Sequence, residues 1–185
     1  MARMDQPLPN TYWVIPGAIL AGEHPYGTHE TEARERLDRL CGAGINYFID
    51  LTEVGEMPDY RGLLPKHAHY LRCAIRDTEV PREIAQMQVL QSRIHNARVL
   101  GRRIYIHCRA GIGRTGVVVG CFLAEGGLDG DAALKQLNQL WRHCARAEAW
   151  PEVPQTSEQA DYIKAWPKHR KSRIPAATAN RRRLR

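Results

Sequence analysis

The stretch "IYIHCRAGIGRTGVVVG", residues 104–120, constrains the fold of this chain more than any other segment. It begins as an apolar run typical of a buried strand and ends as an apolar run that suits a buried helix. Small residues lie between the two runs, with Gly111 and Gly113 where the backbone can turn sharply. A strand joined to a helix by so short a loop favours helices layered on a largely parallel sheet.

The rest of the chain repeats this alternation of strands and helices. Residues 12–27 predict a hairpin that turns at Pro16 and Gly17, and residues 45–51, 68–75 and 103–108 predict buried strands. Amphipathic patterns predict helices over 31–41, from Pro81 to about 101, and over 113–125, 131–145 and 157–166. We therefore expect an α/β fold with a central, mostly parallel sheet flanked by helices. The loops that follow the strands should meet at one rim, where ligands of such sheets bind.

Length and charge suggest one domain followed by a basic tail. A chain of 185 residues with 43% apolar content fits a single globular domain, expected over 1–167. The segment 168–185 holds eight Lys or Arg residues and no acid, and we expect it to be flexible. It could contact nucleic acid, an acidic membrane or an acidic partner, although a solvated tail that aids solubility is the simpler interpretation.

The absence of long apolar runs and of a secretory leader predicts a cytoplasmic location. Five cysteines, an odd number with no CxxC pair, indicate neither a disulfide framework nor a zinc site. We expect no metal and no cofactor. Four of the cysteines are expected to be small buried hydrophobic residues: Cys41, Cys73, Cys121 and Cys144.

Cys108 differs from the other four because it begins the glycine-containing loop at a helix start. Amides that converge there form a nest at the positive end of the helix dipole, which holds an anion and stabilises a thiolate. Arg114 lies six positions later, and its planar fork can bind two oxygens of a tetrahedral anion. A nucleophilic thiolate, a ring of amides and a guanidinium together suit a phosphate monoester.

The motif "HCRAGIGRTG" resembles the signature of the protein tyrosine phosphatase superfamily, with His-Cys, five residues, Arg and then Ser or Thr. The segments "WVIPGAILAGEHP", "FIDLTEVGEMPDY" and "PQTSEQADYIKAW" are similar to segments of its compact dual-specificity-like, bacterial-type members. The resemblance implies that Cys108 forms a phosphocysteine intermediate, that Thr115 donates to the Cys108 sulfur, and that His107 orients the loop. The phosphate would be bound by residues of the loop: Arg109, Ala110, Gly111, Ile112, Gly113 and Arg114.

The same resemblance implies an acid that protonates the leaving group. The family uses an Asp a few residues before a proline, and in "RDTEVP" this pattern matches Asp77, with Glu79 as the alternative. Gln155 and Gln159 resemble the glutamines that position the attacking water in larger family members. For Gln155 a helix-surface role is an equal alternative. Glu53 and Glu56 follow another strand and could brace Arg114, or could be solvated loop acids.

Three functions remain open at this point. The first is hydrolysis of protein phosphotyrosine, with phosphoserine and phosphothreonine as further substrates, since a short chain predicts a shallow pocket. The second is hydrolysis of phosphoinositides, inositol phosphates or RNA 5′ ends. The loop disfavours it, because Arg109 is accompanied by the apolar Ile112 and so offers a single extra positive charge, whereas the basic tail favours it. The third, a non-catalytic phosphate-binding module, is disfavoured because Cys108, Arg114 and Asp77 are all present.

Overall fold

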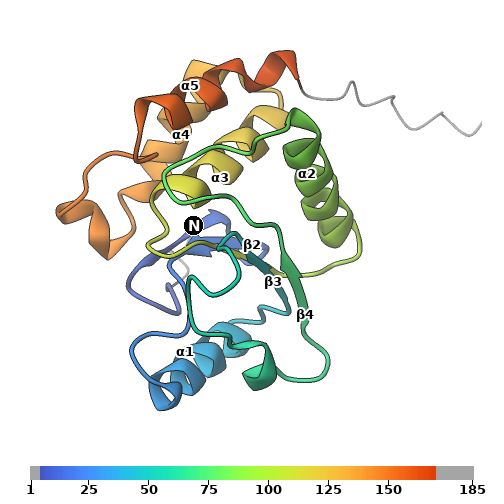
Figure 1. Cartoon of the computed structure of the whole chain (residues 1–185), viewed down its shortest axis with the longest axis vertical. Helices are drawn as coiled ribbons and strands as arrows, with labels where there is room; N and C mark the ends of the chain where they lie inside the picture. The colour runs from blue at the N-terminus through green and yellow to red at the C-terminus, as the bar shows by residue number, and fades with distance from the viewer. Residues whose placement is uncertain (1–4, 170–185) are drawn as a thin grey trace, which may run out of the picture.

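A computed structural model describes residues 5–169 of the chain. Five strands form one sheet in the order β1-β2-β5-β3-β4, with helices on both faces (Figure 1). The strands are β1 (Thr11–Ile15), β2 (Ile19–Gly22), β3 (Tyr47–Asp50), β4 (His69–Arg72) and β5 (Ile104–His107). β1 and β2 are antiparallel, and the other pairs are parallel. The predicted α/β class and the predicted hairpin are therefore confirmed.

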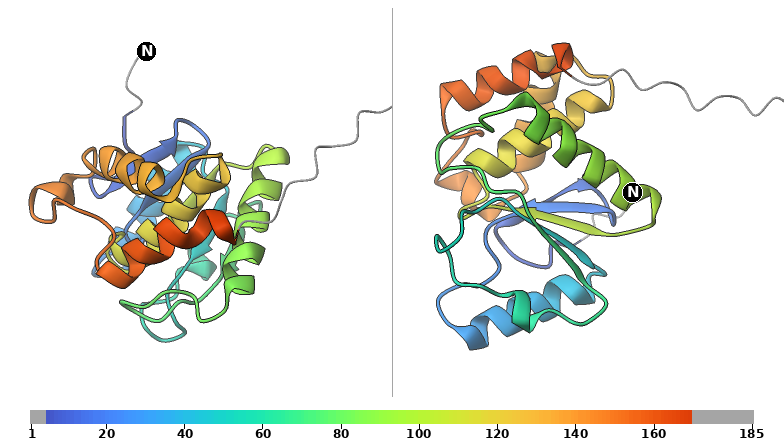
Figure 2. Two further views of the ribbon diagram at one scale, coloured as in Figure 1. Left: turned by 90° about the horizontal axis from the view of Figure 1, so that it is seen from above. Right: turned by 45° about the vertical axis from the view of Figure 1, so that its right-hand side comes forward.

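The helices divide unevenly between the two faces of the sheet. α1 (Glu30–Gly42) covers one face, and four helices cover the other, as Figure 2 shows from two further directions. These four are α2 (Ile84–Val99), α3 (Gly113–Glu125), α4 (Gly130–Trp141) and α5 (Ser157–Ala165). Short 3₁₀ turns η1 (Arg61–Leu63), η2 (Ala145–Glu148) and η3 (Trp166–Lys168) lie between or after them. Within residues 5–169, no helix is both long and apolar enough to span a bilayer.

The period-two alternation of the strands explains why both faces are apolar. In β5, Ile104 and Ile106 join the core under α2–α5, whereas Tyr105 joins the smaller core under α1. Likewise in β2, Ile19 faces the first core and Leu20 the second. A sheet that is apolar on both faces must be covered on both, which is the layered architecture that the alternation of elements predicts.

Several predicted boundaries move in the structure. The helix expected to begin at Pro81 begins at Ile84 with Glu83 as its N-cap, so Pro81 lies in the preceding loop rather than in the first turn. The helix expected to reach 145 ends at Trp141, and η2 follows as a separate turn. Of the predicted basic tail, residues 170–185 lie outside the described part of the chain.

Two of the four cysteines expected to be buried are only half-buried. Cys121 and Cys144 lie in the core, but Cys41 and Cys73 keep part of their surface exposed. Cys41 occupies the last turn of α1, and Cys73 follows the edge strand β4, where cover from neighbouring elements is incomplete. The expectation of buried side chains is thus wrong for Cys41 and Cys73.

Candidate active site

Cys108 follows β5 directly, and β5 is the middle strand of the sheet. The register places His107 opposite Gly22 of β2 on one side and Asp50 of β3 on the other. All three residues end their strands at the same edge, where Cys108 begins the loop 108–112 that leads into α3. Cys108 itself is buried, with 3% of its surface exposed. The convergence of loops that the sequence predicts at this rim is confirmed.

The carbonyl groups of the loop are held by groups outside it. The Cys108 carbonyl lies 3.4 Å from His107 Nδ1, and the Arg109 carbonyl accepts a hydrogen bond from the His24 N–H at 3.0 Å. Because a peptide is planar and trans, its N–H points opposite to its carbonyl. Carbonyls held on the outside therefore favour amides turned inward, the arrangement of an anion nest.

Gly111 fits where no other residue would. Its φ is +79°, and a Cβ built there would lie 2.6 Å from the carbonyl carbon of Gly22. Both the backbone conformation and the close approach of the β2 end require glycine. The loop is thus packed directly against the end of β2.

Arg114 is buried in the first turn of α3 and is fixed by two other loops. Its two terminal nitrogens donate to the Glu56 carboxylate at 2.7 and 2.6 Å, and Nη1 also donates to the Ile75 carbonyl at 3.0 Å. Asp77 Oδ1 lies 2.9 Å from Arg114 Nη2. Burial opposes ionisation of Glu56, but the hydrogen bonds from Arg114 prevail and lower the pKa of that carboxyl. Of the two acids considered, Glu56 is therefore the one that braces Arg114.

Two of the buried polar side-chain atoms that have no partner among residues 5–169 lie at the start of α3. One is Nε of Arg114, and the other is Oγ1 of Thr115, the residue after it. A buried polar group without a partner is costly, so each one calls for an explanation, such as a role in binding or catalysis. Here both lie at the helix start that follows the loop. The expected hydrogen bond from Thr115 to Cys108 stays a prediction.

The loop between β4 and α2, residues 73–83, is called the acid loop here because it carries Asp77 and Glu79. The structure gives these two alternative acids different partners. Asp77 reaches Arg114, as described, whereas Glu79 pairs with Arg76 at 3.3 Å. Thr78 between them has φ of +64°, and its N–H donates to Asp77 Oδ1 at 3.1 Å. A positive φ at a β-branched residue is strained, and such strain is concentrated at functional positions. This placement favours Asp77 over Glu79.

His107 is completely buried beneath the loop, in a buried polar group formed by His24, Asp50, Tyr60 and His107. Its Nε2 lies 2.6 Å from the Tyr60 hydroxyl, and its Nδ1 lies 4.0 Å from Asp50. Burial lowers the pKa of His107 to about 4, and burial together with His107 lowers the pKa of His24 to about 3. Both rings are therefore neutral near pH 7, which suits the structural role expected of His107.

This group contains two imidazoles and a carboxylate, the side chains that bind metals. Ligand atoms of His24, Asp50 and His107 lie within 4.8 Å of one another. However, both oxygens of Asp50 are already engaged, by Thr52 and by Tyr70 and Arg72. A carboxylate saturated in this way, beside a guanidinium, suits a hydrogen-bonded network better than a cation site.

Gln155 and Gln159 do not share a helix face. α5 begins at Ser157, so Gln155 lies outside it, whereas Gln159 is buried in the capping box of Thr156. The Gln159 amide is engaged at both ends: Oε1 accepts from the Gln155 and Thr156 N–H groups, and Nε2 donates to the Glu79 carbonyl at 3.0 Å. Gln159 therefore ties α5 to the acid loop.

Residues of the loop differ in exposure as a binding loop requires. Arg109 is exposed, Ala110 is half-buried and Ile112 is buried, while Gly113 lies against the Gln159 amide. Arg109 is thus the loop side chain that offers charge to solvent at the rim.

Several residues of the site are absent from the sequence-based prediction. They are Glu23, His24, Asp50, Tyr60 and Arg146. Arg146 contacts Ala110, which is 36 positions away in the sequence, and it contacts Glu23, which is 123 positions away. Separations of this size leave no local pattern, although His24 and Glu23 lie within a segment whose family resemblance was visible.

Comparison with known proteins places the chain in a family. Residues 8–165 match the family model described as Swiss Army Knife protein, DSP-PTPase phosphatase domain. A protein of Invertebrate iridescent virus 3 that is named a candidate tyrosine phosphatase, 067L, is 34% identical over 99 residues, which are 49% of this chain and 38% of that protein. Phosphatidylglycerophosphate phosphatase PTPMT2 of Arabidopsis thaliana is 31% identical over 98 residues, which are 50% of this chain and 41% of that protein. The chain thus spans less than half the length of these two relatives.

Solved structures share the fold at lower identity. Tk-PTP in its active form superposes with a TM-score of 0.66 at 22% identity, over 86% of this chain and 97% of that chain. PTPMT1 in complex with PI(5)P superposes with a TM-score of 0.62 at 16% identity, over 86% and 95%. DUSP15 superposes with a TM-score of 0.63 at 21% identity, over 86% of this chain and 88% of that chain. These structures share the fold, and the match over residues 8–165 shows that the chain belongs to the protein tyrosine phosphatase superfamily, as a compact member that resembles the dual-specificity phosphatases.

Proposed function

We propose that this protein hydrolyses phosphate monoesters through a phosphocysteine intermediate, with phosphotyrosine in proteins as its substrate. The observation that carries the proposal is the setting of Cys108. The thiol begins a loop whose carbonyls are held outward, and the loop ends at a buried guanidinium with an unpartnered Nε. A phosphoryl group seated there would meet amides and Arg114 on its oxygens and sulfur at phosphorus.

The reaction has two steps. In the first, the Cys108 thiolate attacks phosphorus, the bond from phosphorus to the ester oxygen breaks, and Asp77 gives its proton to that oxygen. In the second, water attacks phosphorus, Asp77 takes a proton from the water, and the Cys108 thiolate leaves. Thr115 would stabilise this thiolate through its hydroxyl, and inorganic phosphate is released. Gln155 remains the candidate for positioning the water, because the Gln159 amide is already engaged.

Two observations favour phosphotyrosine as the substrate. The viral relative is named for tyrosine phosphatase activity, and it matches about half of this chain. A phenolic leaving group on a flat ring also needs little more than a shallow site and one proton donor, and Asp77, with 52% of its side chain exposed, is accessible to such a group.

An anionic phospholipid is the second candidate. The Arabidopsis thaliana relative is named for phosphatidylglycerophosphate, and PTPMT1 was crystallised with PI(5)P. The exposed Arg109 would supply charge at the rim for a headgroup. The basic segment 168–185 would add attraction to an acidic surface.

A panel assay in the presence of a chelator tests both candidates. We expect the highest kcat/KM on phosphotyrosine peptides, lower values on phosphoserine and phosphothreonine peptides, and release of phosphate to stop in Cys108→Ser. A higher kcat/KM on phosphatidylglycerophosphate or PI(5)P vesicles would transfer the assignment to lipids. Full activity of Cys108→Ser would overturn the mechanism, whereas tight phosphate binding without turnover in the unaltered protein would indicate a binding module.

A further inference from the structure

We propose that Arg146 is a positioning residue for the phosphate-binding loop and that Glu23 holds it in place. The inference rests on the proposed function, since it concerns how the loop comes to bind phosphate. Arg146 belongs to the short turn η2 (Ala145–Glu148), which lies after α4 and far from the loop in sequence.

The contact between Arg146 and the loop is direct. Its Nη1 donates to the Ala110 carbonyl at 2.5 Å, and its Nη2 donates to Glu23 Oε2 at 2.7 Å. The side chain keeps 29% of its surface exposed and that of Glu23 keeps 12%, so the pair is largely shielded from water. Hydrogen bonds from a guanidinium are about twice as strong as those between neutral groups.

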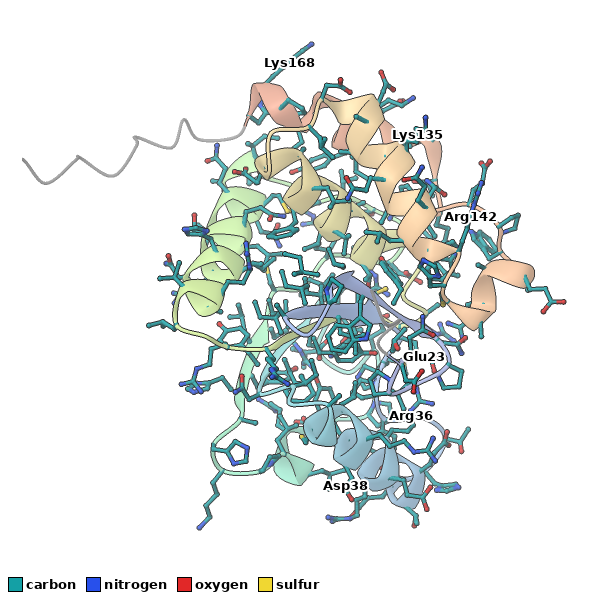
Figure 3. The ribbon with its side chains drawn as sticks, turned by 180° about the vertical axis from the view of Figure 1, so that it is seen from behind. Glu23, Arg36, Asp38, Lys135, Arg142 and Lys168 are labelled. Carbon is teal, nitrogen blue, oxygen red and sulfur yellow. The ribbon has the colours of Figure 1, made fainter. Side chains whose placement is uncertain are left out.

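Glu23 is itself fixed on several sides. Its Oε1 accepts a hydrogen bond from Arg36 at 2.5 Å, and its Oε2 accepts another from Asn10 at 3.0 Å. The Tyr105 hydroxyl donates to the Glu23 main-chain carbonyl. Figure 3 shows Glu23 and Arg36 near each other on the side of the molecule opposite to the view of Figure 1. Because the Glu23 carboxylate is held by these other groups, it fixes the position of the Arg146 side chain toward the loop.

Arg146 fixes the orientation of one peptide group. While it holds the Ala110 carbonyl on the outside of the loop, the N–H of Gly111 in the same planar peptide must point the other way, to the side that would enclose phosphate. The neighbouring peptide is oriented in the same way, because its Arg109 carbonyl accepts a hydrogen bond from the His24 N–H. Gly111, with its positive φ, is the residue at which such a peptide could most easily flip. Arg146 thus acts where the loop is most free to turn.

The test compares Arg146→Met and Glu23→Gln with the matched control Arg142→Met. Arg142 is an exposed arginine four residues before Arg146, and Figure 3 shows it well apart from Glu23. The probe is orthovanadate, whose binding is measured by calorimetry. A second readout is the pH midpoint for alkylation of Cys108 by iodoacetamide, followed at that cysteine by mass spectrometry.

We expect Arg146→Met to weaken orthovanadate binding about tenfold, since one charged hydrogen bond to the loop is lost. The alkylation midpoint should move to higher pH, because an amide that stabilises the thiolate has turned away. Glu23→Gln should shift both readouts in the same direction by a smaller amount, and Arg142→Met should stay within about twofold of the unaltered protein. A purely structural role would change the melting temperature and leave both readouts in place.

The inference is overturned if folded Arg146→Met and Glu23→Gln match the unaltered protein in vanadate affinity and in alkylation. Should Arg146→Met fail to fold, Arg146→Lys and Glu23→Gln provide the same comparison. Failure of the proposed function gives a different result. An unaltered protein that turns over no phosphate monoester, yet binds orthovanadate more tightly than Arg146→Met, would refute the catalysis and support the positioning role.

Discussion

At the scale of single residues, Arg114 connects three loops that are far apart in sequence. Arg114 itself follows the loop that begins at Cys108, and it donates to Glu56 in the loop after β3. In the acid loop after β4 it donates to the Ile75 carbonyl and lies beside Asp77. Its remaining buried donor, Nε, has no partner among the described residues. A guanidinium that is already fixed on one side loses little further conformational freedom when it binds an oxyanion on the other.

Replacing Glu56 by glutamine should release Arg114 from its carboxylate brace. We expect kcat/KM to fall about 10-fold, the effect of one or two charged hydrogen bonds. The variant Glu53→Gln is the control, because the side chain of Glu53 is exposed and its contact with Glu56 is made by the backbone N–H. Equal losses in the two variants would show that the brace has no role in catalysis.

The same glutamate should also make stability depend on pH. Its folded-state pKa lies below the ordinary value of 4.5, so the stabilisation is present above that value and is lost as the pH falls through the folded-state pKa. The unfolding free energies of the unaltered protein and of Glu56→Gln should therefore differ more at pH 7 than at pH 3.5. Urea denaturation at the two values provides the measurement.

Asp77→Asn should affect poor leaving groups far more than good ones. Without its proton donor, the enzyme should show a kcat about 100-fold lower on phenyl phosphate, and a much smaller loss of kcat on p-nitrophenyl phosphate. The basic limb of the pH profile should also disappear. Glu79→Gln is the matched control, and the reverse result, with Glu79→Gln sensitive and Asp77→Asn near the unaltered protein, would exchange the two roles.

At the scale of elements, the start of α5 and the acid loop form one unit through Gln159. The glutamine completes the capping box with Thr156 and donates to the Glu79 carbonyl. Gln86 of α2 holds the other side of the loop by donating to the Ala74 carbonyl at 2.8 Å. The loop that carries Asp77 is therefore anchored to two helices.

Gln159→Ala should destabilise the protein as well as slow it. Loss of a helix cap and of a buried amide pair costs about 1–3 kcal/mol of unfolding free energy. Glu158→Ala, at the exposed neighbouring position, should change stability by less than about 0.5 kcal/mol. Denaturant unfolding of both variants measures the difference, and equal stability of the two would show that Gln159 does not hold the element.

Sequence patterns predict elements of this fold better than the contacts between them. The loop from Cys108 to Arg114 is readable because its glycines, its nucleophile and its helix start are contiguous. The sequence offers both Glu53 and Glu56 as partners of Arg114, and only the geometry selects Glu56. Arg146 is not predictable, because an arginine in a short turn after a helix resembles any solvated arginine until Ala110 is placed beside it. The predicted start of α2 is wrong because Pro81 suits a first turn and an ordinary loop equally well.

At the scale of the whole molecule, the buried polar group beneath the loop makes two imidazoles neutral. Burial lowers the folded-state pKa of His107 to about 4 and that of His24 to about 3, against 6.5 for both in the unfolded chain. The unfolded chain therefore binds more protons than the folded chain between these limits. Above pH 6.5 such a histidine is neutral in both states and does not reduce the stability of the fold. Below pH 6.5 the unfolded chain takes up protons first, so the fold becomes progressively less stable.

We expect the unfolding free energy to fall between pH 6.5 and 5 by up to about 1.4 kcal/mol per pH unit for each of the two histidines. This window lies above the range in which the buried carboxylates titrate, so it isolates the imidazoles. Urea denaturation at several pH values measures the slope, and His24→Gln should reduce it by about half. A flat profile over this range would contradict the assignment of neutral buried rings.

The central place of β5 has a consequence for the order in which the molecule opens. β5 is paired on both sides, with β2 and with β3, whereas β4 lies at an edge of the sheet and is only partly covered. Native-state hydrogen exchange should therefore find the amides of β5 among the last to exchange, through global unfolding, and those of β4 among the earlier ones, through local fraying. The nucleophile is attached to the segment of the sheet that local fluctuations disturb least, so its loop can keep its shape while the edge of the protein moves.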